Sequence, residues 1–135
     1  MKTQLIRMSV FAVVTATAVW AQSSHVGKAN IPFDFIVGSH TMPAGQYTVE
    51  HTKPLLILKS AEGPVQSVIT NSIESVNAQT VGKLVFHKYG NEYFLSEDWR
   101  PGSKSGRHLR MTSRERELAA RRGLETGTTI VAVAK

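Results

Sequence analysis

Residues 84–97 constrain the fold more than any other segment, because they predict a β-hairpin. The runs LVFHKY and EYFLSE are rich in β-branched and aromatic residues and are separated only by Gly90-Asn91. A two-residue loop that begins with glycine is typical of a type II′ turn between antiparallel strands. Such a turn fixes the register and places Phe86 opposite Leu95. The chain is therefore expected to fold around an antiparallel sheet.

The predicted hairpin is apolar on both faces. We assign one face to the core, and it carries Leu84, Phe86, Tyr93, Leu95 and Trp99. The opposite face, which is unusually apolar for a surface in contact with water, carries Val85, His87, Tyr89 and Phe94. This second face is either covered by another element or exposed as a binding face for a partner. We favour the covered alternative, because large exposed apolar patches are rare on soluble monomers.

The segment before residue 52 predicts two more strands joined by a turn. Phe33, Phe35 and Val37 recur with the period of two that is typical of a strand with one buried face. Residues 42–45, Met-Pro-Ala-Gly, fit a β-turn with proline at its second position and glycine at its fourth. Alternation turns Asp34 to the opposite face from the flanking phenylalanines, so we expect a solvated or locally hydrogen-bonded carboxylate rather than a catalytic acid.

Four other segments are expected to add strands. A continuous apolar run at residues 54–59 predicts a buried strand, and residues 65–75 predict either one bulged strand or two short ones. After a loop at residues 100–107, a short strand is expected at residues 108–111. Residues 128–134, TTIVAVA, predict a last strand that returns to the sheet.

One short helix is expected near the C-terminus. Thr112 suits a helix N-cap, with Glu115 three residues later completing a capping box, and Gly123 suits the end of a helix of about ten residues. Together these elements predict an all-β fold. We expect a single-domain β-sandwich or a barrel-like antiparallel sheet of about seven to eight strands, with the one helix attached.

The N-terminal residues predict export. Lys2 and Arg7 precede an uncharged run of 14 residues that ends in Val-Trp-Ala at residue 21, as in a secretory signal peptide. This run is too short to cross a hydrocarbon core of roughly 30 Å comfortably. We therefore expect a signal peptide at residues 1–21, a mature chain beginning at Gln22 and no transmembrane helix after cleavage. A retained N-terminal anchor is the alternative, and the destination is the periplasm, the outer envelope or the medium.

The predicted mature chain, residues 22–135, has 114 residues and no cysteine. Its length suits one domain, and neither disulfide bonds nor thiol chemistry can contribute. Nucleophile-elbow, phosphate-binding and metal-ligand spacings are missing, and the five histidines are far apart in sequence. The adjacent Glu97 and Asp98 are expected on opposite strand faces and cannot act as a pair. We expect no cofactor, no metal and no enzymatic activity, with a catalytic site assembled from distant residues as the alternative.

The positive charge is concentrated in one segment. Without Lys2 and Arg7 the chain has 14 bases and 10 acids, a net charge of +4, whereas residues 100–122 alone carry eight bases and two acids, a net charge of +6. Such asymmetry favours an anionic polymer or lipid head group as partner, and solvated surface arginines are the alternative. If these cations are exposed, their charge reversal should leave folding nearly intact. The candidate polyanion-binding residues are Arg100, Lys104, Arg107, Arg110, Arg114 and Arg121.

The combination IPFDFIVG, MPAGQYTV and LVFHKYGNEYFLSE resembles a family of small exported bacterial proteins with a similar N-terminal motif and hairpin, whose function is not established. The resemblance covers most of the mature chain. It implies a β-rich, sandwich-like fold and export, and it implies no activity, cofactor or site residue. Two hypotheses remain: a non-enzymatic envelope or secreted module that binds a protein or glycan, and a binder of polyanions or anionic lipids through residues 100–122.

Overall fold

The structure is a computed structural model that describes residues 25–121 and 123–134. The predicted signal peptide at residues 1–21 lies outside the described residues. Within the described ranges, no helix is long and apolar enough to cross a membrane.

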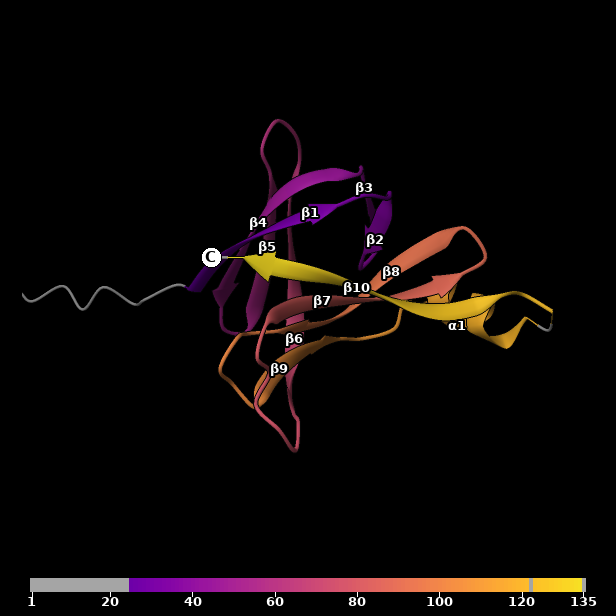
Figure 1. Ribbon diagram of the computed structural model, residues 1–135. Helices are drawn as coiled ribbons and strands as arrows, with labels where there is room; N and C mark the ends of the chain where they lie inside the picture. The colour runs from indigo at the N-terminus through magenta and orange to yellow at the C-terminus, as the bar shows by residue number, and fades with distance from the viewer. Residues whose placement is uncertain (1–24, 122, 135) are drawn as a thin grey trace, which may run out of the picture.

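In the described residues, ten strands form one sheet, and eight of them close into an antiparallel barrel (Figure 1). The barrel order is β8-β7-β10-β1-β4-β5-β6-β9, and pairing of β9 with β8 closes it. The two remaining strands form a small hairpin, in which β2 also pairs with β8 in parallel. The strands are β1 (His25–Ile31), β2 (Phe35–Val37), β3 (His40–Met42), β4 (Gly45–Thr52), β5 (Leu55–Ser60), β6 (Val65–Glu74), β7 (Gly82–Tyr89), β8 (Glu92–Trp99), β9 (Ser105–Leu109) and β10 (Thr126–Ala134). The one helix is α1 (Ser113–Ala120).

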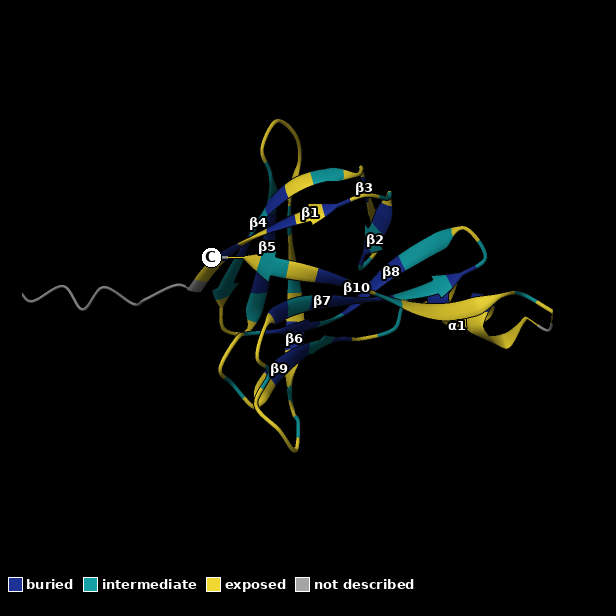
Figure 2. Cartoon of the chain, viewed as in Figure 1, coloured by how far each residue is buried: buried dark blue, intermediate teal, exposed yellow. Residues whose placement is uncertain are grey.

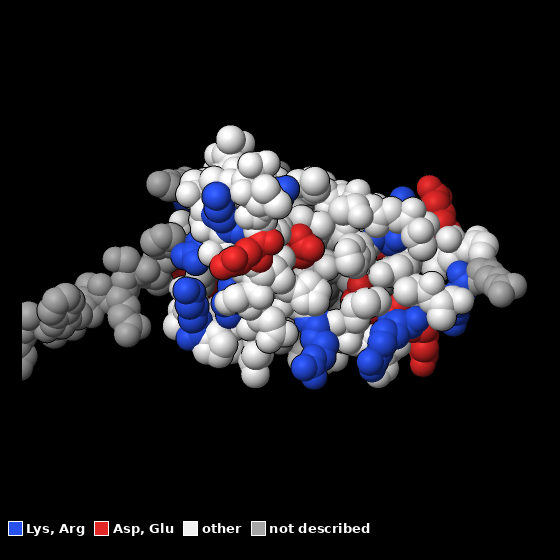
Figure 3. Space-filling view, turned by 90° about the horizontal axis from the view of Figure 1, so that it is seen from below, with Lys and Arg blue, Asp and Glu red and all other residues white. Residues whose placement is uncertain are grey.

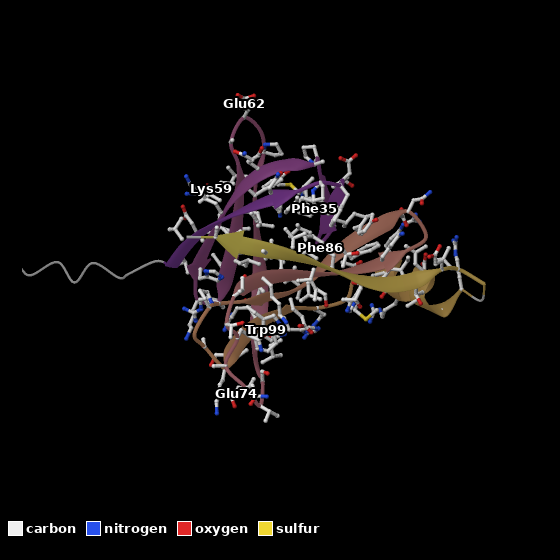
Figure 4. The ribbon with its side chains drawn as sticks, in the orientation of Figure 1. Phe35, Lys59, Glu62, Glu74, Phe86 and Trp99 are labelled. Atoms are coloured by element: carbon white, nitrogen blue, oxygen red, sulfur yellow. The ribbon has the colours of Figure 1, made fainter. Side chains whose placement is uncertain are left out.

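Side-chain alternation fills the barrel interior. On β4 and β5 every second residue is buried, as for Tyr47 and Val49 or Leu56 and Leu58. Phe86 lies inside with its ring 5.4 Å from that of Phe35, which the small β2–β3 hairpin contributes (Figure 4). The core is therefore packed with side chains rather than hollow, and the barrel-like alternative of the predicted fold is confirmed.

The predicted hairpin is confirmed down to its register. Tyr89 lies opposite Glu92 and Phe86 opposite Leu95. Gly90 has a φ of 62°. Among the described residues only glycines have a positive φ, so the φ of Asn91 is negative. This combination is that of a type II′ turn, which requires a positive φ only at its first central position.

A β-bulge changes the second half of the hairpin. The register shifts between Val85 and Phe86, so that Val85 faces Glu97 and Ser96 is the extra residue on β8. Beyond the bulge Asp98 lies opposite the buried Leu84 and points into the barrel. The assignment of Trp99 to the interior face is therefore wrong. The Trp99 ring packs on the outer face of the sheet against Gly106 of β9. A Cβ added at Gly106 would lie 2.6 Å from this ring.

Two strand predictions need correction, and one open alternative is decided. The run at residues 54–59 is a half-buried strand rather than a fully buried one, because Leu55 and Ile57 remain partly exposed. Residues 65–74 form one strand, the first of the two predicted alternatives, and its pairing shows no register shift. Strand β9 begins at Ser105, inside the predicted loop, because it pairs with β6 from Glu74 onward.

The helix is capped as predicted at its start. Thr112 accepts a hydrogen bond from the backbone N–H of Glu115 at 3.2 Å. The helix ends at Ala120 with Arg121 as the C-cap, before the predicted terminator Gly123. Leu118 is buried against the hairpin, and most of the opposite surface of the helix is exposed (Figure 2).

Replacement of Gly90 by valine should destabilise the fold by roughly 1–3 kcal/mol, because a β-branched residue is strained at positive φ. The new Cβ would also approach Leu124 Cδ1 to 3.1 Å. Gly127→Ala is the matched control, since no atom lies within 4 Å of an added Cβ there. Chemical denaturation measures both, and an equal midpoint shift in the two variants would contradict the turn assignment.

Candidate functional site

The buried ionisable side chains of the barrel interior lie together at one end of the barrel. His51 on β4, Asp98 on β8 and Arg107 on β9 lie there, and all three are largely buried. Ionisable side chains are seldom buried without a specific partner. Both ends of the described chain lie at the same end of the barrel, because Lys28 pairs with Ala134 (Figure 1). This end is the strongest candidate for a functional site, since buried ionisable side chains are often found at such sites.

Asp98 is the most deeply buried of the three, with 1% of its surface exposed. Its Oδ2 is hydrogen-bonded to His51 Nε2, which joins β8 to β4 across the interior. An ionised carboxylate only accepts hydrogen bonds, so Nε2 is the donor. The other oxygen, Oδ1, has no hydrogen-bond donor in the structure. A buried carboxylate oxygen without a donor is rare and calls for a ligand or water.

Arg107 supplies positive charge beside this pair. It lies opposite Asp98 in the β8–β9 ladder, and the two side chains leave the sheet on the same face. Its guanidinium donates to Thr70 Oγ1 at 2.8 Å, to Ser72 Oγ at 2.7 Å and to the backbone oxygens of Thr70 and Pro54 at 3.0 and 3.4 Å. These bonds hold Arg107 in place and connect β9 to β6.

A pocket of about 320 Å³ opens at this end of the barrel. Its polar walls are Asp98, His51 and Arg100. The remaining residues that form it are small or apolar, and they come from β1, from β10, from the end of β8 and from the turn that follows β8. They are Val26, Gly27, Trp99, Pro101, Val133 and Ala134. The pocket is at the small end of the range for ligand sites, which are typically mostly apolar with a few polar groups.

A second polar cluster lies under α1. Glu115 is 4% exposed, and its Oε1 accepts hydrogen bonds from Tyr89 Oη and lies within bonding distance of His87 Nδ1, both at 3.1 Å. Burial raises the pKa of Tyr89, and the Glu115 carboxylate raises it further. The capping-box carboxylate thus binds the hairpin instead of its own helix N-terminus.

The second hairpin face is covered, in agreement with the favoured alternative. Val85, Tyr89 and Phe94 are buried, and Leu118 of α1 packs against the latter two. His87 is the most accessible of the four residues, with 34% of its side chain exposed. This face is therefore an internal packing surface, not an open binding face.

The basic residues do not form one surface patch. Arg107 is 9% exposed and turned into the barrel, so it is not available to bind a polyanion at the surface. Reversal of its charge would destabilise the fold, contrary to the expectation for an exposed cation. Arg114 pairs with Glu92 at 2.9 Å. Arg100 lies at the pocket, whereas Lys104, Arg110 and Arg121 are exposed. In the view from below, cations are separated by uncharged surface and by carboxylates (Figure 3).

The sequence did not reveal His51 or Asp98 as site residues. They are 47 positions apart, and only barrel closure brings them together. The expectation that Glu97 and Asp98 point to opposite faces is confirmed, since Glu97 bonds to the outward Trp99 Nε1 at 2.7 Å. Which of the two turns inward depends on the bulge at Ser96, and no residue pattern marks that bulge.

Loss of one partner of the buried pair should be costly. His51→Leu leaves the Asp98 charge inside the barrel and should lower the free energy of unfolding by about 3–5 kcal/mol. The double variant with Asp98→Leu should recover much of this loss, because the carboxylate left without its His51 partner is removed as well. Lys59→Leu is the control, since it breaks the more exposed pair with Glu50 and should cost less than about 1 kcal/mol. Equal losses for His51→Leu and Lys59→Leu in urea denaturation would contradict a stabilising buried bond between His51 and Asp98.

No protein-family model, curated protein or solved structure matches the chain. The resemblance to a family of small exported proteins accordingly stays a prediction. Function has to be argued from the barrel end and its chemistry.

Proposed function

We propose that this protein is a non-enzymatic exported binding module, and that the pocket at the polar end of its barrel holds a hydroxylated ring, such as one sugar unit of a glycan. The observation that carries the proposal is Asp98 Oδ1, which lacks a donor in a residue that lines the pocket. Because Oδ1 is itself buried, a shift of the Asp98 side chain toward the pocket would let a ligand hydroxyl supply that donor.

The charges around Asp98 favour a neutral ligand. Arg107 lies opposite the Asp98 carboxylate on β9, and Arg100 stands at the pocket, so both place positive charge near it. An incoming ammonium group would meet these like charges, whereas a hydroxyl would not. The apolar walls, which include Val26 and Val133, suit the C–H faces of a sugar ring. Both features favour a hydroxylated ring over a cation.

The pocket lining supports binding rather than nucleophilic catalysis. A histidine paired with a carboxylate can activate a hydroxyl, thiol or amine. Among the described residues that line this pocket, none is a serine, threonine, cysteine or lysine. His51 Nε2, moreover, is directed at Asp98 and not at a reacting group. The pair therefore suits orientation of a ligand better than activation of a nucleophile.

Binding can be tested with soluble neutral oligosaccharides of glucose, galactose and N-acetylglucosamine, screened on an array and then by calorimetry. We expect binding that changes little with salt, because the ligand carries no charge. Val26→Trp should weaken it about tenfold or more by filling the pocket, since Val26 is 46% exposed at its wall. Asp98→Asn should weaken it as well, because the ligand hydroxyl loses a charged acceptor.

Val76→Trp is the matched control, because Val76 is 87% exposed and lies outside the pocket. Equal binding by this control and by wild type is expected. Failure of every neutral sugar to bind, or equal effects of the two tryptophan variants, would overturn the proposal.

Polyanion binding is the second candidate function, and the residues proposed for it are now only the exposed basic residues around α1. Arg110 and Arg121 flank the helix in sequence and are exposed, whereas Arg114 is neutralised by Glu92. The exposure of Arg110 and Arg121 supports polyanion binding, whereas the separation of basic residues by other surface in Figure 3 argues against it.

Heparin chromatography separates the two candidates. If the polyanion reading holds, the variant Arg110→Glu with Arg121→Glu should elute at lower salt, because fewer counterions are released on binding. Lys28→Glu with Lys53→Glu changes the net charge equally at exposed positions elsewhere and should elute later than the arginine variant. Identical elution of both double variants would show that only net charge matters.

A further inference from the structure

Strand β10 leaves most of one edge unpaired. On one side it pairs with β7 at eight positions, from Thr126 to Val133. On the other side it pairs with β1 only through Val133 and Ala134. Within the described parts of the chain, no strand pairs with this second edge between Thr126 and Ala132. Figure 1 shows β10 running from beside α1 toward the β1 seam. An edge of this length offers a row of backbone donors and acceptors to another strand.

The edge carries none of the usual protection against strand pairing. Natural edge strands are blunted by charged residues, proline, bulges or extreme shortness. The sequence of β10, TGTTIVAVA, has no charge and no proline, and its pairing with β7 proceeds without a register shift. Four consecutive β-branched residues, at positions 128–131, favour extended structure. Ile130 is 58% exposed on the outer face of this strand.

Space beside the seam is bordered in part by small side chains. A groove of about 430 Å³ lies where β1, β4 and β10 meet, and its lining includes Ala29, Ala132 and Ala134 beside the longer Lys28, Gln46 and Tyr47. Neighbouring strands lie about 4.7–4.9 Å apart, so small residues next to an edge ease the approach of another backbone.

We propose that the free edge of β10 pairs antiparallel with the same edge of a second copy of this chain, forming a two-fold dimer. Pairing about a two-fold axis makes the contact self-complementary and closed, so both edges are covered at once. An axis near Ile130 sets the two exposed isoleucines opposite each other, which is a favourable cross-strand pair. Because β10 has no charged residue, two copies meet along it without like-charge repulsion, and a charged peptide would find no complementary partner there.

This interface is separate from the proposed sugar pocket. The pocket uses Val133 and Ala134, which are already joined to β1, whereas the dimer uses the part of β10 before them. Loss of one property therefore leaves the other measurable.

Sedimentation analysis over a concentration series tests the dimer. Wild type should show a monomer–dimer equilibrium, and Ile130→Lys should raise its dissociation constant about tenfold or more, because two lysines would face each other across the axis. Val65→Lys is the matched control, since Val65 is 59% exposed on β6 and should leave the equilibrium unchanged. Circular dichroism verifies that both variants fold.

Cysteine crosslinking locates the contact without relying on a disruptive change. The natural chain has no cysteine, so Ile130→Cys introduces a single thiol. Cβ atoms of directly opposed residues lie about 4.5–5.5 Å apart, close enough for a disulfide after small adjustment. Under mild oxidation Ile130→Cys should form a covalent dimer and Val65→Cys should not. A wild type that stays monomeric at its highest soluble concentration, or a dimer that crosslinks equally through Val65→Cys, would overturn the proposal.

Discussion

The inward direction of Asp98 is the constraint on which the polar end of this barrel depends. The extra residue Ser96 reverses the alternation of β8, so that Asp98 turns inward and Trp99 outward. A carboxylate inside a barrel needs positive charge nearby, because desolvation otherwise disfavours its ionised form. His51 is hydrogen-bonded to the carboxylate from β4, and Arg107 lies opposite Asp98 on β9. Without the bulge, Glu97 and Trp99 would turn inward in place of Asp98, and His51 and Arg107 would lose their present neighbour on β8.

A second buried carboxylate holds helix α1 against the other part of the hairpin. Glu115 is buried and shared by His87 and Tyr89 of β7, just as Asp98 is bound by His51 of β4. Each carboxylate links elements far apart in sequence, and each would be left unpaired in a low-dielectric surrounding if its partner moved. Buried carboxylates thus act as polar crosslinks in a chain that has no cysteine.

Local rules predicted much of the fold but little of the candidate site. The Gly90-Asn91 turn, its register and the Thr112 cap depend on neighbouring residues, and all three are confirmed. The choice between sandwich and barrel depends on β8 pairing with β9, a contact that alternation alone does not specify. The burial of Arg107 follows from that same closure, which is why a charge count placed it on the surface. Sites made by closure leave no spacing signal in the sequence.

The interior of the barrel is filled, and the two proposed contacts lie at the barrel end and along the free edge of β10. Both involve β10, whose last residues close the barrel while its earlier residues remain unpaired on one side. The pocket walls include Val26 and Gly27 from β1 and Val133 and Ala134 from β10, the two sides of the short seam. A ligand held between these walls would stabilise the closed seam, because it binds both strands only when they are together. Strand pairing farther along β10 would restrain the same strand from its free edge, so the two contacts would support one another through a single structural element.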